Sequence, residues 1–86
     1  MAEIDADTRD AWRKNPDDPV DIIVRVSGDL NELGATLEKR GAEVKRRLRL
    51  THSLSIRCRG KLALQLLDEP WVARVEVDRS VKALRR

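Results

Sequence analysis

Apolar and polar residues alternate along four stretches of the chain, which is typical of strands with one buried face. In the first stretch, Ile22, Val24 and Val26 fall on one side, and Ile23 and Arg25 fall on the other. Valine and isoleucine are common in these stretches, and both favour strands. The pattern predicts strands over residues 20–26, 42–50, 53–59 and 71–77.

The second and third predicted strands carry most of the basic residues. In residues 42–50, we expect Val44, Leu48 and Leu50 to face the core, because they alternate with charged residues. Leu54, Ile56 and Cys58 alternate with polar residues in the same way, and the turn at Thr51 and His52 joins the two runs into a hairpin. The outer face of this hairpin is then expected to be basic, through Lys45, Arg47, Arg49, Arg57 and Arg59.

Two helices are predicted between these strands. Over residues 29–40, Leu30, Leu33 and Leu37 form one apolar stripe, with Asp29 as the N-terminal cap and Gly41 at the C-terminal end. A second, shorter leucine-rich helix is predicted over residues 61–67, before Pro70.

The predicted order of elements is β-α-β-β-α-β. Two interleaved strand–helix–strand units of this kind form an α+β, ferredoxin-like fold, with a four-stranded antiparallel sheet and two helices on one face. We assign residues 20–79 to this domain. The other face of the sheet is then left open to solvent or to a partner.

The two ends of the chain differ in charge from the domain. Residues 1–18 carry a net charge of −3 and the remainder +6, so residues 1–19 are interpreted as an acidic, flexible or loosely docked arm. Within it, residues 6–14 are compatible with a helical turn or two, with Ile4 and Trp12 as the large apolar groups. Residues 80–86 form a basic C-terminal tail.

The sequence offers little catalytic chemistry. One cysteine, Cys58, excludes an internal disulfide and a cysteine-rich zinc site, and one histidine, His52, excludes a histidine cluster. No phosphate-binding glycine motif is present. We therefore expect a non-enzymatic protein without cofactor or metal. The chain lacks a signal peptide and an apolar stretch long enough for a membrane span, so we expect a soluble, cytoplasmic protein without a membrane partner.

The net positive charge of the domain is compatible with two kinds of partner. RNA-recognition modules of similar architecture stack bases on aromatic residues of the central strands, but the corresponding positions here are Ile23, Arg25, Ser55 and Arg57. Nucleic acid is therefore a candidate only through its backbone phosphates. The other hypothesis is a protein-interaction or regulatory domain, including a homodimer formed through the face or the edge of its sheet.

Residues 20–82 resemble the propeptide-type inhibitors of subtilisin-like serine proteases. The matching segments are DIIVRV, LEKRGAEVKRRLRL, SLSIRC, LALQLLDEP and WVARVEVD, and the most specific positions are Pro70, Val72, Val75, Glu76 and Asp78. Trp71 departs from the family, which usually has a smaller residue there. The resemblance implies a stand-alone protease inhibitor or folding chaperone, since no protease domain follows in this sequence.

The resemblance also implies which residues bind the partner. In that family, the open sheet face packs on two parallel helices of the protease, and an acidic pair caps the N-termini of those helices; here the pair is Glu76 and Asp78. The tail occupies the active-site cleft, and corresponds to Ser80, Val81, Lys82, Ala83, Leu84, Arg85 and Arg86. The alternative interpretation is that Glu76 and Asp78 form ion pairs with Arg74 and Arg79 at the end of a strand.

Overall fold

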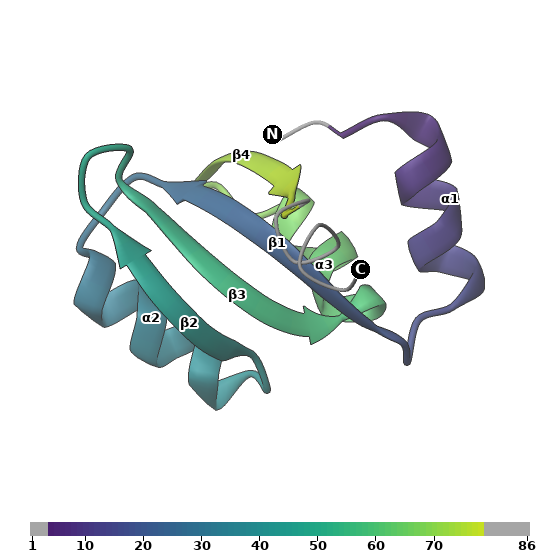
Figure 1. Ribbon diagram of the computed structural model, residues 1–86, viewed down its shortest axis with the longest axis horizontal. Coiled ribbons are helices and arrows are strands. Elements are labelled where there is room, and N and C mark those ends of the chain that lie inside the picture. Colours follow the sequence, from purple (N-terminus) through teal and green to yellow (C-terminus); the bar gives the residue numbers. More distant parts are fainter. Residues whose placement is uncertain (1–3, 79–86) are drawn as a thin grey trace, which may run out of the picture.

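A computed structural model describes residues 4–78, which form four strands and three helices (Figure 1). The elements are α1 (Ala6–Lys14), β1 (Pro19–Val26), α2 (Leu30–Lys39), β2 (Glu43–Leu48), β3 (Ser53–Arg59), α3 (Gly60–Leu67) and β4 (Val72–Val77). The four strands and the helices α2 and α3 are the elements that the sequence pattern predicts, with bounds that differ by two residues or fewer.

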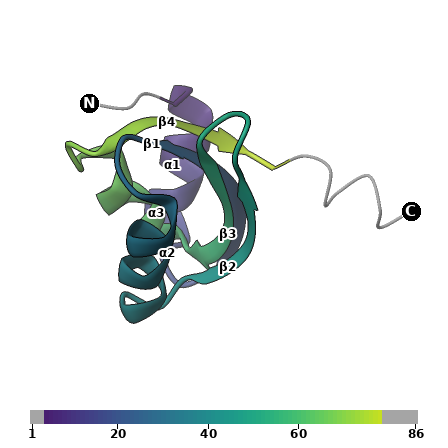
Figure 2. The same cartoon turned by 90° about the vertical axis from the view of Figure 1, so that its left-hand side faces the viewer.

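The strands form one antiparallel sheet in the order β2-β3-β1-β4. The central strands are β1 and β3, and each strand–helix–strand connection passes over one neighbouring strand. Figure 2 shows α2 and α3 on the same side of the curved sheet. The predicted α+β class is therefore confirmed, and the arrangement is compatible with a small ferredoxin-like fold to which α1 is added.

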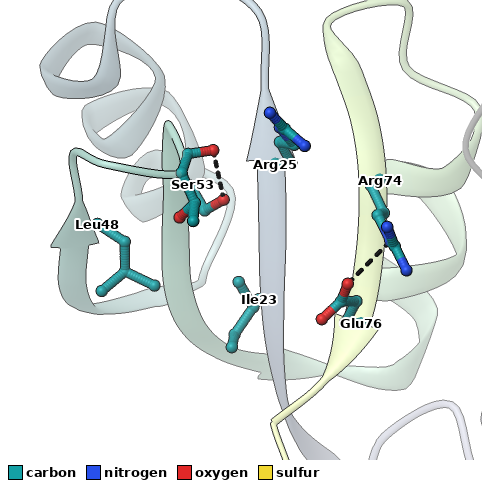
Figure 3. Close-up of a pocket in the computed structure, with 7 residues that line it drawn as sticks. Ile23, Arg25, Leu48, Ser53, Arg74 and Glu76 are labelled. Atoms are coloured by element: carbon teal, nitrogen blue, oxygen red, sulfur yellow. Dashed lines mark hydrogen bonds and ion pairs between the residues drawn. The ribbon is translucent and has the colours of Figure 1, made fainter.

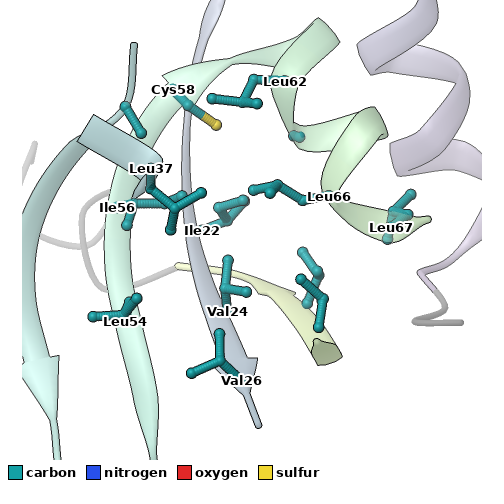
Figure 4. Close-up of a cluster of buried hydrophobic side chains, with 14 of the residues drawn as sticks. Ile22, Val24, Val26, Leu37, Leu54, Ile56, Cys58, Leu62, Leu66 and Leu67 are labelled. Carbon is teal, nitrogen blue, oxygen red and sulfur yellow. The ribbon is translucent and has the colours of Figure 1, made fainter. Parts of the chain in front are cut away.

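The core lies between the sheet and the helices and is almost entirely aliphatic (Figure 4). Ile22 and Val24 of β1, Leu54 and Ile56 of β3, and Leu66 of α3 are completely buried. Cys58 is also buried and packs in this cluster, and Trp71 lies partly buried against it. These side chains occupy the positions that alternation predicts for β1 and β3.

Helix α2 begins and ends as predicted. The carboxylate of Asp29 accepts a hydrogen bond from the backbone N–H of Glu32 at 2.9 Å, which satisfies one of the free N–H groups of the first turn. The chain leaves the helix through Gly41, whose backbone φ of 101° is unfavourable for residues that have a Cβ.

The part of the acidic arm that the structure describes is docked on the domain, so of the two expected alternatives, a flexible and a loosely docked arm, it is closer to the second. Trp12 of α1 is only 5 % exposed and belongs to the core cluster. The carbonyl oxygens of Pro16 and Asp18 accept hydrogen bonds of 3.0 Å from the N–H groups of Lys61 and Gly60, at the N-terminus of α3. A single tryptophan and these two backbone bonds therefore fix the segment, and neither is evident from its acidic composition.

Strand β2 departs from the predicted alternation, because a β-bulge interrupts its register with β3. Val44 is opposite Ile56, but Arg46 is opposite Ser55 and Arg47 is opposite Leu54. One extra residue, Lys45, is inserted between the paired positions, and every later side chain of β2 moves to the other face. The expectation that Leu48 faces the core, and Arg47 the open face, is therefore wrong. Leu50, also expected in the core, lies in the turn and is fully exposed.

Candidate functional site on the open face of the sheet

No helix of residues 4–78 covers the second face of the sheet, which we call the open face (Figure 2). Ile23 and Arg25 of β1 point to this face, because Ile22, Val24 and Val26 point into the core. Strand β3 contributes Ser53, Ser55 and Arg57, and β4 contributes Arg74 and Glu76. Strand β2 adds Arg46 and Leu48, which are opposite Ser55 and Ser53, so the open face is continuous over all four strands.

A hollow of about 220 Å³ lies on the open face near the turn between β2 and β3 (Figure 3). Ile23 and Leu48, both half-buried, supply its aliphatic part, and Ser53 and Thr51 add hydroxyl groups. Figure 3 shows the ionic part, Arg25, Arg74 and Glu76, on the side of β1 and β4. Leu48 reaches this hollow only because of the bulge in β2.

The two arginines of the hollow, Arg25 and Arg74, are direct cross-strand partners. Like charges in directly opposed positions destabilise a sheet. Nε of Arg74 lies 2.8 Å from Oε2 of Glu76, which offsets one of the two charges. Arg25 makes no ion pair with any residue from 4 to 78. The hollow therefore carries a net charge of about +1, with its surplus at Arg25.

In the middle of the open face, polar side chains are buried. Ser55 is completely buried, and its hydroxyl donates to Oδ2 of Asp78 at 3.4 Å, a long hydrogen bond. Asp78 is 5 % exposed, and its backbone N–H donates to the carbonyl of Asp21 at 2.9 Å, which prolongs the pairing of β4 with β1. Asp78 thus joins the end of β4 to both central strands.

At the far end of the open face, Asp21 is the centre of an ion-pair cluster. Its Oδ1 lies 2.9 Å from Nζ of Lys45 and 3.3 Å from Nε of Arg57. The side chain of Asp21 is only 14 % exposed, so both cations pair with a carboxylate that is partly shielded from water. Two of the five predicted basic-face residues therefore share one carboxylate, which offsets one of their two positive charges.

The other three predicted bases do not gather with them. A Cβ at Gly34 of α2 would lie 3.5 Å from Nη2 of Arg47, so this guanidinium lies on the helix side of the sheet. Arg49 lies in the turn after β2, and Arg59 is exposed at the end of β3. The predicted basic face is therefore not one patch, because of the bulge and of Asp21. The bulge has one sign in the sequence, because Arg46 stands at a position where alternation would place an apolar residue, but the role of Asp21 has none.

The two acidic residues of β4 have different surroundings. Glu76 is half-exposed and pairs with Arg74, as the alternative interpretation of the sequence expects, whereas Asp78 is buried against Ser55. Arg79 and the predicted tail, residues 80–86, lie outside the described residues. Glu76 is thus the acidic side chain that a partner can reach directly.

Potential reactive groups are few over residues 4–78. Burial, followed by the negative charge of Asp21, raises the pKa of Cys58 from 9.0 to about 11, against a smaller lowering by a hydrogen bond with the backbone of Ala63. The thiol is thus protonated at neutral pH, when it is a poor nucleophile. No group of three metal-ligating side chains occurs in this part of the chain, and none of its helices has the length and apolar character needed to cross a membrane.

No protein-family model, curated protein or solved structure matches this chain.

Proposed function

We propose that this chain is a protein-binding module that contacts its partner through the open face of the sheet, and that the partner is a subtilisin-like serine protease, which it inhibits or helps to fold. The observation that carries the first part is the hollow, where the half-buried Ile23 and Leu48 lie on a face that no described element covers. Covering these side chains with a partner removes apolar surface from water, at about 25 cal/mol per Å².

The open face presents side chains of the two central strands to a partner. Ser53 and Ser55 of β3 are themselves buried, so a partner contacts the larger side chains around them. The longer Arg25 and Arg57 stand beside them on β1 and β3. The choice of a protease rests on the resemblance of residues 20–82 to the propeptide-type inhibitors.

The structure leads us to assign different roles to Glu76 and Asp78. The half-exposed carboxylate of Glu76 is available to cap the free N–H groups of a partner helix, where a negative charge also interacts with the helix dipole. Asp78 acts within the domain instead, because it ties the end of β4 to Ser55 and Asp21. Residues 80–86 are proposed to extend from β4 into the active-site cleft as a product-like ligand.

An inhibition assay tests this proposal. The purified chain is titrated into several subtilisin-like proteases, and we expect reversible inhibition that Glu76→Gln weakens by about twofold to fivefold, the effect of one exposed helix-terminal carboxylate. Glu38→Gln, which neutralises an exposed carboxylate on α2, is the matched control and should have no effect. If the folded chain leaves every protease active at high micromolar concentration, the protease assignment is wrong.

The regulatory-domain hypothesis makes a different prediction for the same sample. The edge strand β2 carries a bulge and a run of bases, features that discourage edge-to-edge pairing of sheets. A homodimer would therefore form through the open face or through β4, the other edge strand. Sedimentation equilibrium without protease distinguishes the two, since the inhibitor proposal predicts a monomer and the dimer hypothesis a twofold larger mass.

A further inference from the structure

We propose that the hollow near the turn between β2 and β3 binds an acidic side chain of the partner protein, together with an aliphatic side chain of the same segment. The inference deepens the proposed function and rests on it in one respect, that the open face contacts a protein. It names the chemistry of the segment that this face recognises.

The charge of the occupant follows from the cross-strand arginine pair. Arg25 and Arg74 are directly opposed on β1 and β4, and Glu76 pairs with Arg74 at 2.8 Å. The guanidinium of Arg25 has no carboxylate partner among residues 4–78. One further carboxylate balances the cluster and accepts charge-assisted hydrogen bonds from the planar donor group of Arg25. A second positive charge would be repelled.

The size and the aliphatic side of the hollow define the rest of the occupant. About 220 Å³ is less than the roughly 300–1,000 Å³ of pockets that hold drug-sized ligands, so the hollow suits one or two side chains. Ile23 and Leu48 provide an apolar surface next to the arginines. An aliphatic side chain of the partner covers these two, while a neighbouring Asp or Glu reaches Arg25. The hydroxyl of the exposed Thr51 lies on the rim and is available to the peptide backbone, whereas the hydroxyl of the buried Ser53 donates to the carbonyl of Thr51 at 3.0 Å.

Nucleic acid fits this site less well, although it too is anionic. The cationic end contains a carboxylate, Glu76, which repels phosphate groups, and the hollow has no aromatic side chain for base stacking. Toward the other end of the face, Lys45 and Arg57 share the single carboxylate of Asp21, and Arg46 has no ion pair among residues 4–78, so the remaining positive charge there lies outside the hollow. Within the hollow itself, one surplus charge beside an apolar floor matches a mixed acidic and aliphatic peptide.

Peptide titration of the isotope-labelled full chain tests the inference. The probes are capped decapeptides of alanine and serine with one Glu and one Leu, spaced two, three or four residues apart, each matched by a peptide with Gln in place of Glu. Backbone amide shifts are followed up to about millimolar peptide, the range expected for a site of this size. We expect the amide signals of Ile23, Arg25 and Leu48 to shift on addition of the Glu peptides. The Gln peptides should bind with an affinity reduced by up to about tenfold.

Variants of the chain provide the second arm. Arg25→Gln should reduce binding of the Glu peptides to the level of the Gln peptides, and Arg25→Lys should restore part of it, since the charge returns without the planar donors. Arg59→Gln removes an exposed base at the other end of β3 and should leave binding unchanged. Equal binding of Glu and Gln peptides, or shifts confined to other surfaces, would overturn the inference. The comparison of peptides also stands if a variant fails to fold.

The results separate this inference from the proposed function. If the Glu peptides bind at the hollow but no protease is inhibited, the acidic-segment site is supported and the assignment of a protease as the partner is wrong. If the chain inhibits a protease and Arg25→Gln leaves the inhibition unchanged, the inhibitor proposal is supported and the proposed acidic-segment site is wrong. A duplex DNA or single-stranded RNA probe that causes larger shifts at the hollow than the Glu peptides do would also contradict the inference.

Discussion

Nζ of Lys45 lies 2.9 Å from Oδ1 of Asp21, so a residue inserted into β2 by a bulge reaches past β3 to a carboxylate on β1. Arg57 on the intervening strand approaches the same oxygen at 3.3 Å. The Asp21 carboxylate therefore connects three strands on the open face. This explains why two of the strongest candidates for an anion-binding surface are occupied within the domain.

Replacing Asp21 by Asn should destabilise the domain by about 1–2 kcal/mol, because the charge of a mostly buried carboxylate that bonds both Lys45 and Arg57 is lost. Urea unfolding followed by circular dichroism measures the change. The double variant Asp21→Asn with Lys45→Met provides the control, since removal of one cation should recover part of the loss. If Asp21→Asn alone changes the free energy of unfolding by less than about 0.3 kcal/mol, the cluster behaves as an ordinary surface ion pair.

Replacing Gly34 by Ala should stabilise the domain. The added Cβ meets Arg47 Nη2 at 3.5 Å and Leu54 Cδ2 at 3.9 Å, both ordinary contacts. Alanine inside a helix is favoured over glycine by about 0.8–1 kcal/mol. An increase of about 0.5–1 kcal/mol in the free energy of unfolding is therefore expected. A decrease would show that Arg47 cannot adjust and that the packing of α2 against β2 is tighter than these distances indicate.

Replacing Gly60 by Ala should have the opposite effect. Its Cβ would lie 3.0 Å from the carbonyl oxygen of Asn15 and 3.2 Å from that of Trp12, both backbone atoms that move only if α1 shifts. We expect a loss of about 1–3 kcal/mol, the usual range for overpacking. Fluorescence of Trp12 should shift to the red if α1 detaches, with Trp12→Phe as the reference for the signal of Trp71. An unchanged free energy of unfolding would contradict the docked position of α1.

The Cys58 thiol should make stability depend on alkaline pH. The folded chain keeps this proton up to about pH 11, whereas the unfolded chain loses it near pH 9, the ordinary pKa of 9.0. The contribution is therefore fully present below pH 9 and is lost as the pH rises through 11, at about 1.4 kcal/mol per pH unit. The free energy of unfolding of the native chain, relative to that of Cys58→Ala, should fall over this window. A constant difference would show that the thiol titrates as in the unfolded chain.

The four strands and the helices α2 and α3 were predictable, because the residues that determine them act locally. Alternation in β1 and β3 reflects burial of one sheet face, and Asp29 and Gly41 act within a turn of α2. The docking of α1 was not predictable from the sequence. It depends on where Trp12 and the carbonyls of Pro16 and Asp18 meet the rest of the domain.

The candidate site was predictable only in part, for a related reason. The position of Ile23 and Arg25 on the open face follows from β1 alone, but their pairing with Arg74 and Leu48 depends on strand order and register. The bulge at Lys45 reverses the faces of Arg47 and Leu48, and its one sign in the sequence is Arg46, a charged residue at a position where alternation expects an apolar one. Pairing between distant strands is not encoded in any single stretch of sequence.

One comparison of inhibition constants tests most directly the claim that the open face binds a protease. Ile23→Lys places a charge in the hollow opposite Glu76, an arrangement that a cross-strand pair tolerates, so the variant should fold. Ala35→Lys adds the same charge at an exposed position of α2, on the other side of the domain. Our account predicts that Ile23→Lys weakens inhibition of a subtilisin-like protease by about tenfold or more, equivalent to about 1.4 kcal/mol, and that Ala35→Lys leaves it unchanged. Equal inhibition by the two folded variants would contradict it.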